Sequence, residues 1–150
     1  MKAGDPFRKI EKILHNYRLN CARLEYLRIE LEELRRAGDV RVQDYSGRLS
    51  AGAGNANPVD TYVQKILTLE HRISVLEKYT APIARLHEDF RMSTDTMSRN
   101  YLRILEDYYL GGLTVSRILE LTHWNKSTFY SRRLSLVSLT VGYLNSQALY

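Results

Sequence analysis

Basic and hydroxyl side chains gather behind a short turn near the C-terminal end of the sequence, and their types suit contact with a nucleic acid. Lys126, Ser127, Ser131 and Arg132 or Arg133 recur at spacings that let them face outward from one helix. Lys and Arg side chains reach phosphates or the edge of guanine, and Ser hydroxyls both donate and accept hydrogen bonds. These residues predict a helix surface that contacts the major groove of double-stranded DNA.

A turn between two short helices is predicted directly before this cluster. Thr114 is a favourable N-cap for the first helix, and Asn125, which ends the turn His123-Trp124-Asn125, is a favourable N-cap for the second. Trp124 and Phe129 supply apolar groups that close the angle between the helices. This is the pattern of a helix-turn-helix motif, whose second helix enters the major groove. A buried helical hairpin with no role in DNA binding would share the same apolar spacing.

The motif defines a set of candidate contacts with DNA. Thr114 and Arg117 on the first helix are expected to approach phosphates, while the start of the second helix reads or clamps the groove. No acidic residue follows Glu120, which favours a surface that faces phosphates. The candidate DNA-binding residues are Thr114, Arg117, Asn125, Lys126, Ser127, Thr128, Tyr130, Ser131, Arg132 and Arg133.

No group of residues predicts catalysis, so the chain is expected not to be an enzyme. The four His residues are scattered, and none has a metal-ligand spacing to another His or to Cys21, the only cysteine. The segment AGAGNAN, residues 51–57, lacks the Lys-Ser/Thr of a phosphate-binding loop. We therefore expect no catalytic residue, no metal and no cofactor.

Composition and charge place the chain among ordinary globular proteins. Its 150 residues carry a formal net charge of +5, a modest attraction toward polyanions. No apolar run approaches the roughly 20 residues that a membrane-spanning helix needs. Residues 1–12 lack the apolar core of a signal peptide, and a lone cysteine fits a reducing compartment. These features predict a cytoplasmic protein without a membrane partner.

Two long amphipathic helices are predicted before the motif, at residues 6–36 and 58–90. Residues 38–57 hold four of the eight Gly residues and predict a long flexible connection between the two helices. Pro82 should kink or interrupt the second helix near Tyr79. The apolar seams consist of Ile10, Leu14, Tyr17, Cys21, Leu24 and Leu31 in the first helix and of Tyr62, Ile66, Leu69, Ile73, Leu76, Ile83 and Phe90 in the second.

The expected fold class is all-α, with a long helical hairpin or coiled-coil arm over residues 1–92 and a helix-turn-helix domain over residues 93–150. A third helix over 94–110 should stop at Gly111-Gly112, where glycine accepts a positive φ. The last helix should reach about Leu144, with a seam formed by Tyr130, Leu134, Val137, Val141 and Leu144. One motif covers only a short site, so a homo-oligomer is expected, with a dimer favoured.

The run Leu102–Tyr130, LRILEDYYLGGLTVSRILELTHWNKSTFY, resembles region 4 of the primary-type bacterial sigma factors. The shared pattern is a leucine-rich helix, an aromatic-Leu-x-Gly-Leu-Ser/Thr link and the start of the second helix at Asn125–Tyr130. The sequence departs from the family at two positions. His123 stands where the family usually has Gly, so it must accept a left-handed backbone. Arg133 stands where the family usually has an apolar residue, which leaves the rotation of the second helix open.

The layout of the whole chain resembles that of phage late-gene transcriptional activators of the ArpU/RinA type. The shared features are a long first helix, a Gly/Ser/Asn-rich break, a Pro-capped second helix and a C-terminal motif like sigma region 4. The resemblance is most residue-specific at Glu106–Gly112 and at the helix start Asn125–Tyr130. This resemblance implies binding to a phage promoter in a bacterial host cell. It also implies recruitment of host RNA polymerase to packaging and morphogenesis genes.

Two other functions fit the same sequence features. A small terminase subunit also joins a helix-turn-helix to a helical oligomerisation region, and it recognises phage DNA for packaging. A sigma-like protein-interaction module would grip polymerase or another protein without touching DNA. The oligomeric state and the salt dependence of duplex binding separate these alternatives.

Overall fold

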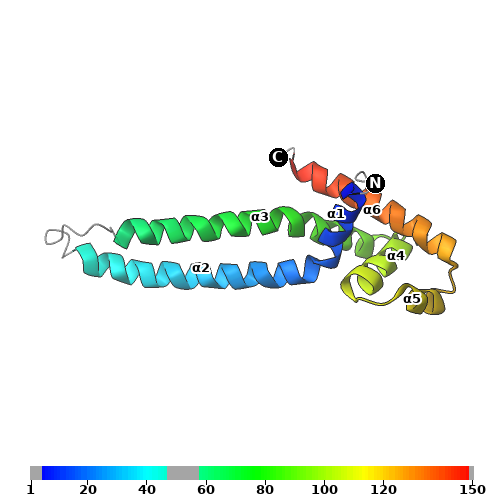
Figure 1. Cartoon of the computed structure of the whole chain (residues 1–150), viewed down its shortest axis with the longest axis horizontal. Helices are drawn as coiled ribbons and strands as arrows, with labels where there is room; N and C mark the ends of the chain where they lie inside the picture. Colours follow the sequence, from blue (N-terminus) through cyan, green and yellow to red (C-terminus); the bar gives the residue numbers. More distant parts are fainter. Residues whose placement is uncertain (1–4, 47–57, 149–150) are drawn as a thin grey trace. The chain divides into compact units, whose positions relative to one another are not determined.

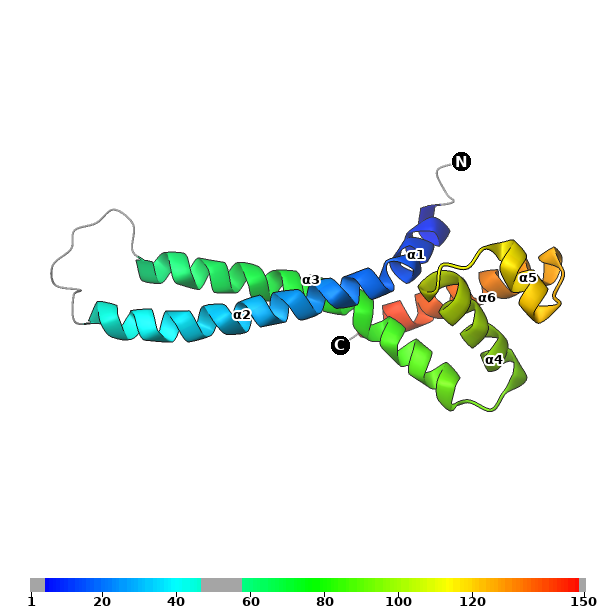
Figure 2. The same cartoon turned by 90° about the horizontal axis from the view of Figure 1, so that it is seen from below.

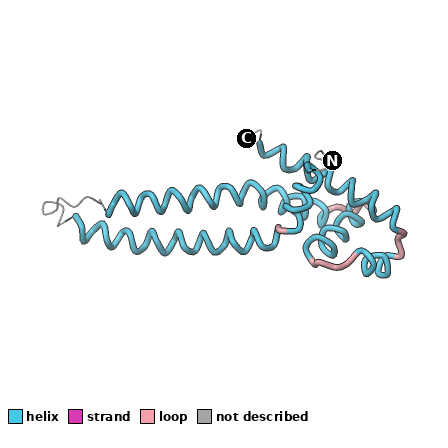
Figure 3. Tube along the Cα trace, viewed as in Figure 1, coloured by secondary structure: helices cyan, strands magenta, loops and turns pink. Residues whose placement is uncertain are grey.

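The computed structural model describes residues 5–46 and 58–148. Over these ranges the chain is all-α, with six α-helices, one π-helical segment and no strand (Figures 1 and 3). The fold class predicted from the sequence is confirmed at this level. In chain order the elements are α1 (Asp5–His15), α2 (Tyr17–Ser46), α3 (Pro58–Met92), α4 (Thr96–Arg103), the π-helix η3 (Ile104–Leu110), α5 (Val115–Thr122) and α6 (Lys126–Ala148).

The chain forms two compact units. One comprises Cys21–Glu77, and the other combines Met1–Asn20 with Lys78–Tyr150. This division differs from the boundary expected after residue 92. Its physical reason is that α1 and the C-terminal part of α3 share a hydrophobic core with the helices of the predicted DNA-binding motif.

The unit Cys21–Glu77 is an antiparallel helical hairpin made by α2 and α3, which lie side by side in both views (Figures 1 and 2). Arg28 pairs with Glu77 at 2.7 Å and Arg35 pairs with Glu70 at 2.6 Å, so residue numbers rise along α2 as they fall along α3. The predicted packing of two long helices is confirmed. Its core consists of Leu24, Leu31, Leu69 and Ile73, with Leu27, Leu34, Ile66 and Leu76 packed against it.

The first predicted helix differs from the structure in two respects. The helix expected over 6–36 is divided at Asn16 into α1 and α2, although the Asn16 backbone N–H still donates to the Lys12 carbonyl at 2.9 Å and the Asn16 carbonyl accepts from the Asn20 N–H at 2.8 Å. In addition, α2 continues to Ser46, although Gly38 was expected to begin the connection. The ring of Tyr62 occupies the space that a Cβ at Gly38 would take, so this Gly is a packing position rather than a helix end. The rest of the expected connection, residues 47–57, lies outside the described residues.

Pro82 does not interrupt the second long helix. The helix α3 runs continuously from Pro58 to Met92, although Pro82 lacks the N–H that would bond to the Lys78 carbonyl. Pro82, Ile83 and Leu86 are all fully buried. Burial of this apolar side holds the helix together across the missing hydrogen bond.

The second unit has one contiguous core that draws on all of its helices. The helix α1 contributes Leu14, and it packs on η3 and α6. The remaining buried core residues are Ile83, Leu86 and Phe90 of α3, Ile104, Leu105 and Tyr109 of η3, Ile118 of α5, and Phe129, Leu136 and Val137 of α6. This core holds η3, α5 and α6, the three helices of the predicted motif, together.

A π-helical segment, η3, replaces the end of the predicted third helix. The wider turn of a π-helix places residues five apart above one another, so both Ile104 and Tyr109 face the core. The segment ends at Gly111, where a Cβ would lie 2.9 Å from the backbone oxygens of Glu106 and Asp107. Gly112 then adopts a φ of 71°, which confirms the expected role of this Gly pair in stopping the helix.

Candidate nucleic-acid interface

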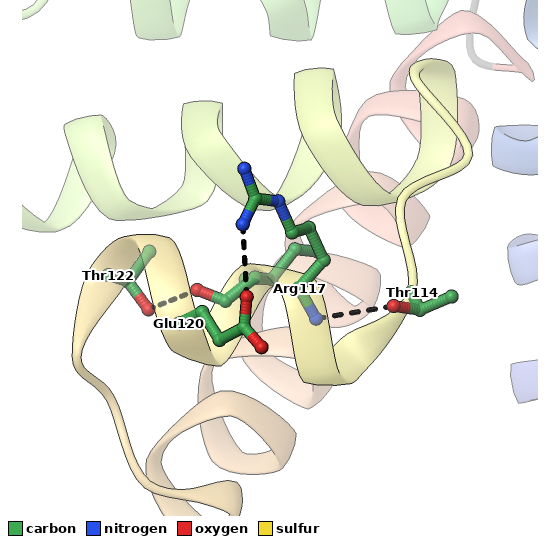
Figure 4. A network of polar contacts seen from close by, with 5 residues as sticks. Thr114, Arg117, Glu120 and Thr122 are labelled. Atoms are coloured by element: carbon green, nitrogen blue, oxygen red, sulfur yellow. Dashed lines mark hydrogen bonds and ion pairs between the residues drawn. The ribbon is translucent and has the colours of Figure 1, made fainter.

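The helix α5 begins at a side-chain cap on Thr114. The Thr114 hydroxyl oxygen accepts a hydrogen bond from the Arg117 backbone N–H at 3.2 Å, as predicted (Figure 4). The Arg117 guanidinium points along the helix surface to Glu120, at 3.0 Å, and it is largely exposed. An exposed pair of this kind is weak, so Arg117 can exchange Glu120 for a phosphate.

The turn between α5 and α6 passes through a left-handed residue. His123 has φ 61° and ψ 21°, and its backbone N–H donates to the Leu119 carbonyl at 2.8 Å. This confirms the expectation that His123 takes the conformation usually given to Gly. The Thr122 hydroxyl donates to the Ile118 carbonyl (Figure 4). It also accepts from the Trp124 backbone N–H, so the turn is closed by local hydrogen bonds.

The substitution His123→Gly is expected to raise the free energy of unfolding by about 1 kcal/mol, because it removes the cost of a left-handed non-Gly residue. Chemical denaturation of the parent and the variant measures this difference. His71→Gly, in the interior of α3, is the matched control and should destabilise by about 1 kcal/mol. A destabilised His123→Gly variant would contradict the turn geometry.

The helix α6 begins at Lys126 behind a second side-chain cap. The Asn125 side-chain oxygen accepts a hydrogen bond from the Thr128 backbone N–H at 2.8 Å, which confirms the predicted cap. The first turn of α6 contains no acidic residue. The positive end of the helix dipole and the Lys126 side chain therefore act together on any anion placed there.

The inner angle of the motif is filled by the two predicted aromatic residues. Phe129 is fully buried, and its ring meets the Tyr108 ring edge to face at 5.4 Å between centroids. Trp124 is half-buried against the same core. The Arg132 guanidinium lies over the Trp124 ring at 4.6 Å, which holds this cation beside the turn.

Arg133 does not lie on the outer face of α6. Its guanidinium contacts both carboxylate oxygens of Glu11 on α1, with Nε 3.0 Å and Nη2 3.3 Å away, and its side chain is only 19% exposed. The Tyr109 hydroxyl donates to the same carboxylate at 2.8 Å. Burial and this hydrogen bond raise the pKa of Tyr109 far above its ordinary value. Of the two arginines expected as alternatives on the outward face, Arg133 is therefore not the outward one, because it is the cation of a partly buried network.

The exposed side chains at the start of α6 are those of Lys126, Ser127, Tyr130 and Ser131. Lys126 has no ion pair within the described parts of the chain. Thr128 and Arg132 are partly covered beside the outward face. Of the ten candidate residues, all except Arg133 thus lie at the caps or on the surface of α5 and the first turns of α6.

The prediction of an apolar seam along α6 is largely wrong. Tyr130 and Leu134 are 48% and 56% exposed, and Val141 is exposed too, whereas only Val137 of that series is buried. The buried side is instead made by Phe129, Leu136, Val137 and Thr140. Leu134 consequently joins the outward face with Ser127 and Ser131, at spacings of four and three. Those spacings could have identified Leu134 from the sequence.

Neither a metal site nor a membrane-spanning segment emerges from the described residues. Across 5–46 and 58–148, no three His, Cys, Asp or Glu side chains are arranged to hold a metal ion. None of the helices in these ranges combines the length and apolar character that crossing a bilayer requires.

Comparison of the chain with protein families, with curated proteins and with solved structures finds no match to any of them.

Proposed function

We propose that the chain is a sequence-specific double-stranded DNA-binding transcriptional regulator that acts through α5 and α6. The observation that carries this proposal is the start of α6. A capped, cation-bearing helix end there presents exposed Lys126, Ser127 and Ser131 with no carboxylate in its first turn. Helix ends of this chemistry suit phosphates and base edges in the major groove.

Each part of the motif has a separate role in the proposed complex. Lys126 neutralises a phosphate, and Ser127 and Ser131 bond to base edges or to the sugar-phosphate backbone. Arg132, held over Trp124 at 4.6 Å, extends from the turn toward the duplex. Thr114 and Arg117 meet the phosphates on the approach side. Arg133 is left out of the interface, because its pairing with Glu11 orients α1 against α6.

The proposed biological role follows from the resemblance to phage late-gene activators. The protein binds a promoter upstream of packaging and morphogenesis genes and recruits host RNA polymerase in the cytoplasm of the bacterial host. A homodimer would double the short site read by one motif. The apolar seams of α2 and α3 face each other within the hairpin core, so the surfaces that join two copies lie elsewhere.

The sigma-like protein-interaction module remains a second candidate function, and one observation favours it. The line Ser127, Ser131 and Leu134 on α6 is uncharged, and Leu134 is 56% exposed. An apolar residue in the middle of the outward face suits a protein partner as well as a thymine methyl group.

The proposal is tested by selecting bound DNA duplexes from a random pool. The affinity of the protein for the most enriched duplex is then measured at several salt concentrations. The double variant Lys126→Ala/Arg132→Ala is expected to lose the selected motif and to bind the winning duplex at least about tenfold more weakly. Its salt slope should fall by about 1 to 2, since each lost phosphate contact lowers the slope by roughly 0.9.

The matched control is Lys78→Ala/Arg99→Ala, which removes the same charge from exposed positions on α3 and α4. This variant should retain the selected motif and most of the affinity. Steep salt dependence without an enriched motif, together with a ring of many subunits in light scattering, would support the packaging role of a small terminase subunit. Absence of duplex binding would support the protein-interaction module.

A further inference from the structure

The two long edges of the hairpin Cys21–Glu77 differ in chemistry. One edge is bridged by the ion pairs Arg28–Glu77 and Arg35–Glu70. Arg23 is five residues before Arg28 and so lies roughly 140° away around α2. The edge that carries Arg23 has no ion pair between the helices in the described part of the hairpin, and it opens as a groove of about 690 Å³.

The floor of this groove is apolar and only half-covered. Leu27 of α2 and Leu76 of α3 are partly buried against the hairpin core, while Tyr26 and Val75 line the same groove and are exposed. Tyr26 is 67% exposed, and even the four core residues of the hairpin each retain some exposure. A further apolar segment laid in the groove would complete the burial that two helices alone do not reach.

The rim of the groove is basic. Arg23 and Arg72 line it from opposite helices, His71 lies beside Arg72, and neither Arg has a carboxylate partner within the described residues. Arg72 also lines a second cavity of about 500 Å³, which extends along α3 to Thr61 and whose other charged lining residues are Glu30 and Lys65, so the basic rim is confined to the part of the groove around Arg23 and Arg72. The stretch of α3 from Thr61 to Leu76 is roughly 22 Å long, which matches about four turns of a bound helix.

We propose that this groove docks an acidic amphipathic helix of a partner protein. The apolar face of that helix, formed by Leu or similar side chains, would rest on Leu27, Leu76 and Val75. The carboxylates that flank this face would pair with Arg23 and Arg72. Helices bind in grooves of this kind through apolar anchors at spacings of three, four and seven. Charge complementarity at the rim sets the orientation and selects acidic partners.

Two other occupants fit the groove less well. A symmetric pair of copies centred on the part of the groove lined by Arg23 and Arg72 would bring these cations of both chains together. A duplex would meet an apolar floor where its phosphates need donors. The docking proposal concerns the hairpin alone and does not depend on the function proposed for α5 and α6.

The experiment uses the full chain and a displayed library of peptides about 20 residues long, a length at which isolated helices become viable. Leu is fixed at helical spacing, and the flanking positions vary among Glu, Lys, Gln and Ser. The expected result is enrichment of Glu flanks. In fluorescence anisotropy titrations, the double variant Arg23→Glu/Arg72→Glu should bind the selected peptide at least about tenfold more weakly than the parent. Tyr26→Ser should weaken binding of the selected peptide by roughly fivefold, because it removes an exposed aromatic ring that lines the groove.

The matched control is Arg36→Glu/Lys78→Glu, which makes the same change in net charge outside the groove and should leave peptide affinity unchanged. Circular dichroism and thermal unfolding establish that each variant is folded. The proposal is overturned if peptides with Lys or neutral flanking residues are enriched, or if no peptide binds. It is also overturned if Arg23→Glu/Arg72→Glu binds the selected peptide as tightly as the parent does. Self-association that Arg23→Glu/Arg72→Glu abolishes, or competition by duplex DNA at the groove, would also overturn it.

Discussion

Glu11→Ala is expected to lower the free energy of unfolding of the Lys78–Tyr150 unit, which includes α1, by about 3–5 kcal/mol. The substitution removes the only carboxylate that Arg133 contacts in the described structure. It leaves the guanidinium with only the rings of Phe7, Tyr108 and Tyr130, and it leaves the Tyr109 hydroxyl without its acceptor. Both charged side chains are less than one-fifth exposed, so water replaces the lost partner poorly. Denaturant unfolding monitored by the fluorescence of Trp124 measures the loss.

A double-mutant cycle separates the network from ordinary packing. Arg133→Ala alone should destabilise by a similar amount, and Glu11→Ala/Arg133→Ala by much less than the sum of the two single losses. Replacing both side chains by Leu should recover most of the stability, because an apolar pair leaves no buried charge unpaired. Glu88→Ala is the control, since its pair with Arg91 at 3.9 Å is exposed and should contribute less than about 1 kcal/mol. Additive losses in the cycle would contradict the network.

This network also shows what the sequence could not provide. The sequence predicted that Arg132 or Arg133 faces outward from the second helix of the motif, and it left the choice between them open. The Arg133 partner Glu11 lies 122 residues away on α1, and no local pattern connects the two. One signal did exist, since Arg133 occupies a position that is usually apolar in the resembling family. An apolar position that holds an Arg indicates either a rotated helix or a buried pair, and the structure has the buried pair.

The local features of the motif, by contrast, could be predicted from the sequence. The caps at Thr114 and Asn125, the left-handed His123 and the positive φ of Gly112 are all as expected. These features depend on hydrogen bonds and steric limits within three or four residues, so the necessary information is local. The long helices were likewise found from their apolar spacing, which is a local periodicity.

Helix limits and unit boundaries depended on contacts that are distant in sequence. Gly38 looked like a helix end, but the ring of Tyr62 packs against it from the facing helix. The sequence predicted α1 as the start of the arm, yet Leu14 is buried in the core that also contains residues of α5 and α6. Periodicity identifies an apolar side of a helix but does not specify its partner. That limit explains why the boundary expected after residue 92 differs from the structure.

Neighbouring residues on α6 should separate the fold of the motif from its proposed function. Phe129→Ala is expected to cost about 3–5 kcal/mol, because it empties a fully buried site at the junction of η3, α5 and α6. Tyr130→Ala, one residue later, removes a side chain that is 48% exposed and should cost less than about 1 kcal/mol. Chemical denaturation of both variants measures the two losses.

Duplex binding should then fall in both variants for different reasons. Phe129→Ala should regain affinity for the selected duplex at low temperature or at saturating duplex, because binding to the folded state offsets its lost stability. Tyr130→Ala should stay folded and yet bind more weakly, by roughly 1–3 kcal/mol if its ring stacks or contacts a base edge. A Tyr130→Ala variant with parental affinity would remove Tyr130 from the interface. Phe129→Ala with parental stability would show that α6 does not pack on the core, and the placement of every residue on its outer face would then be wrong.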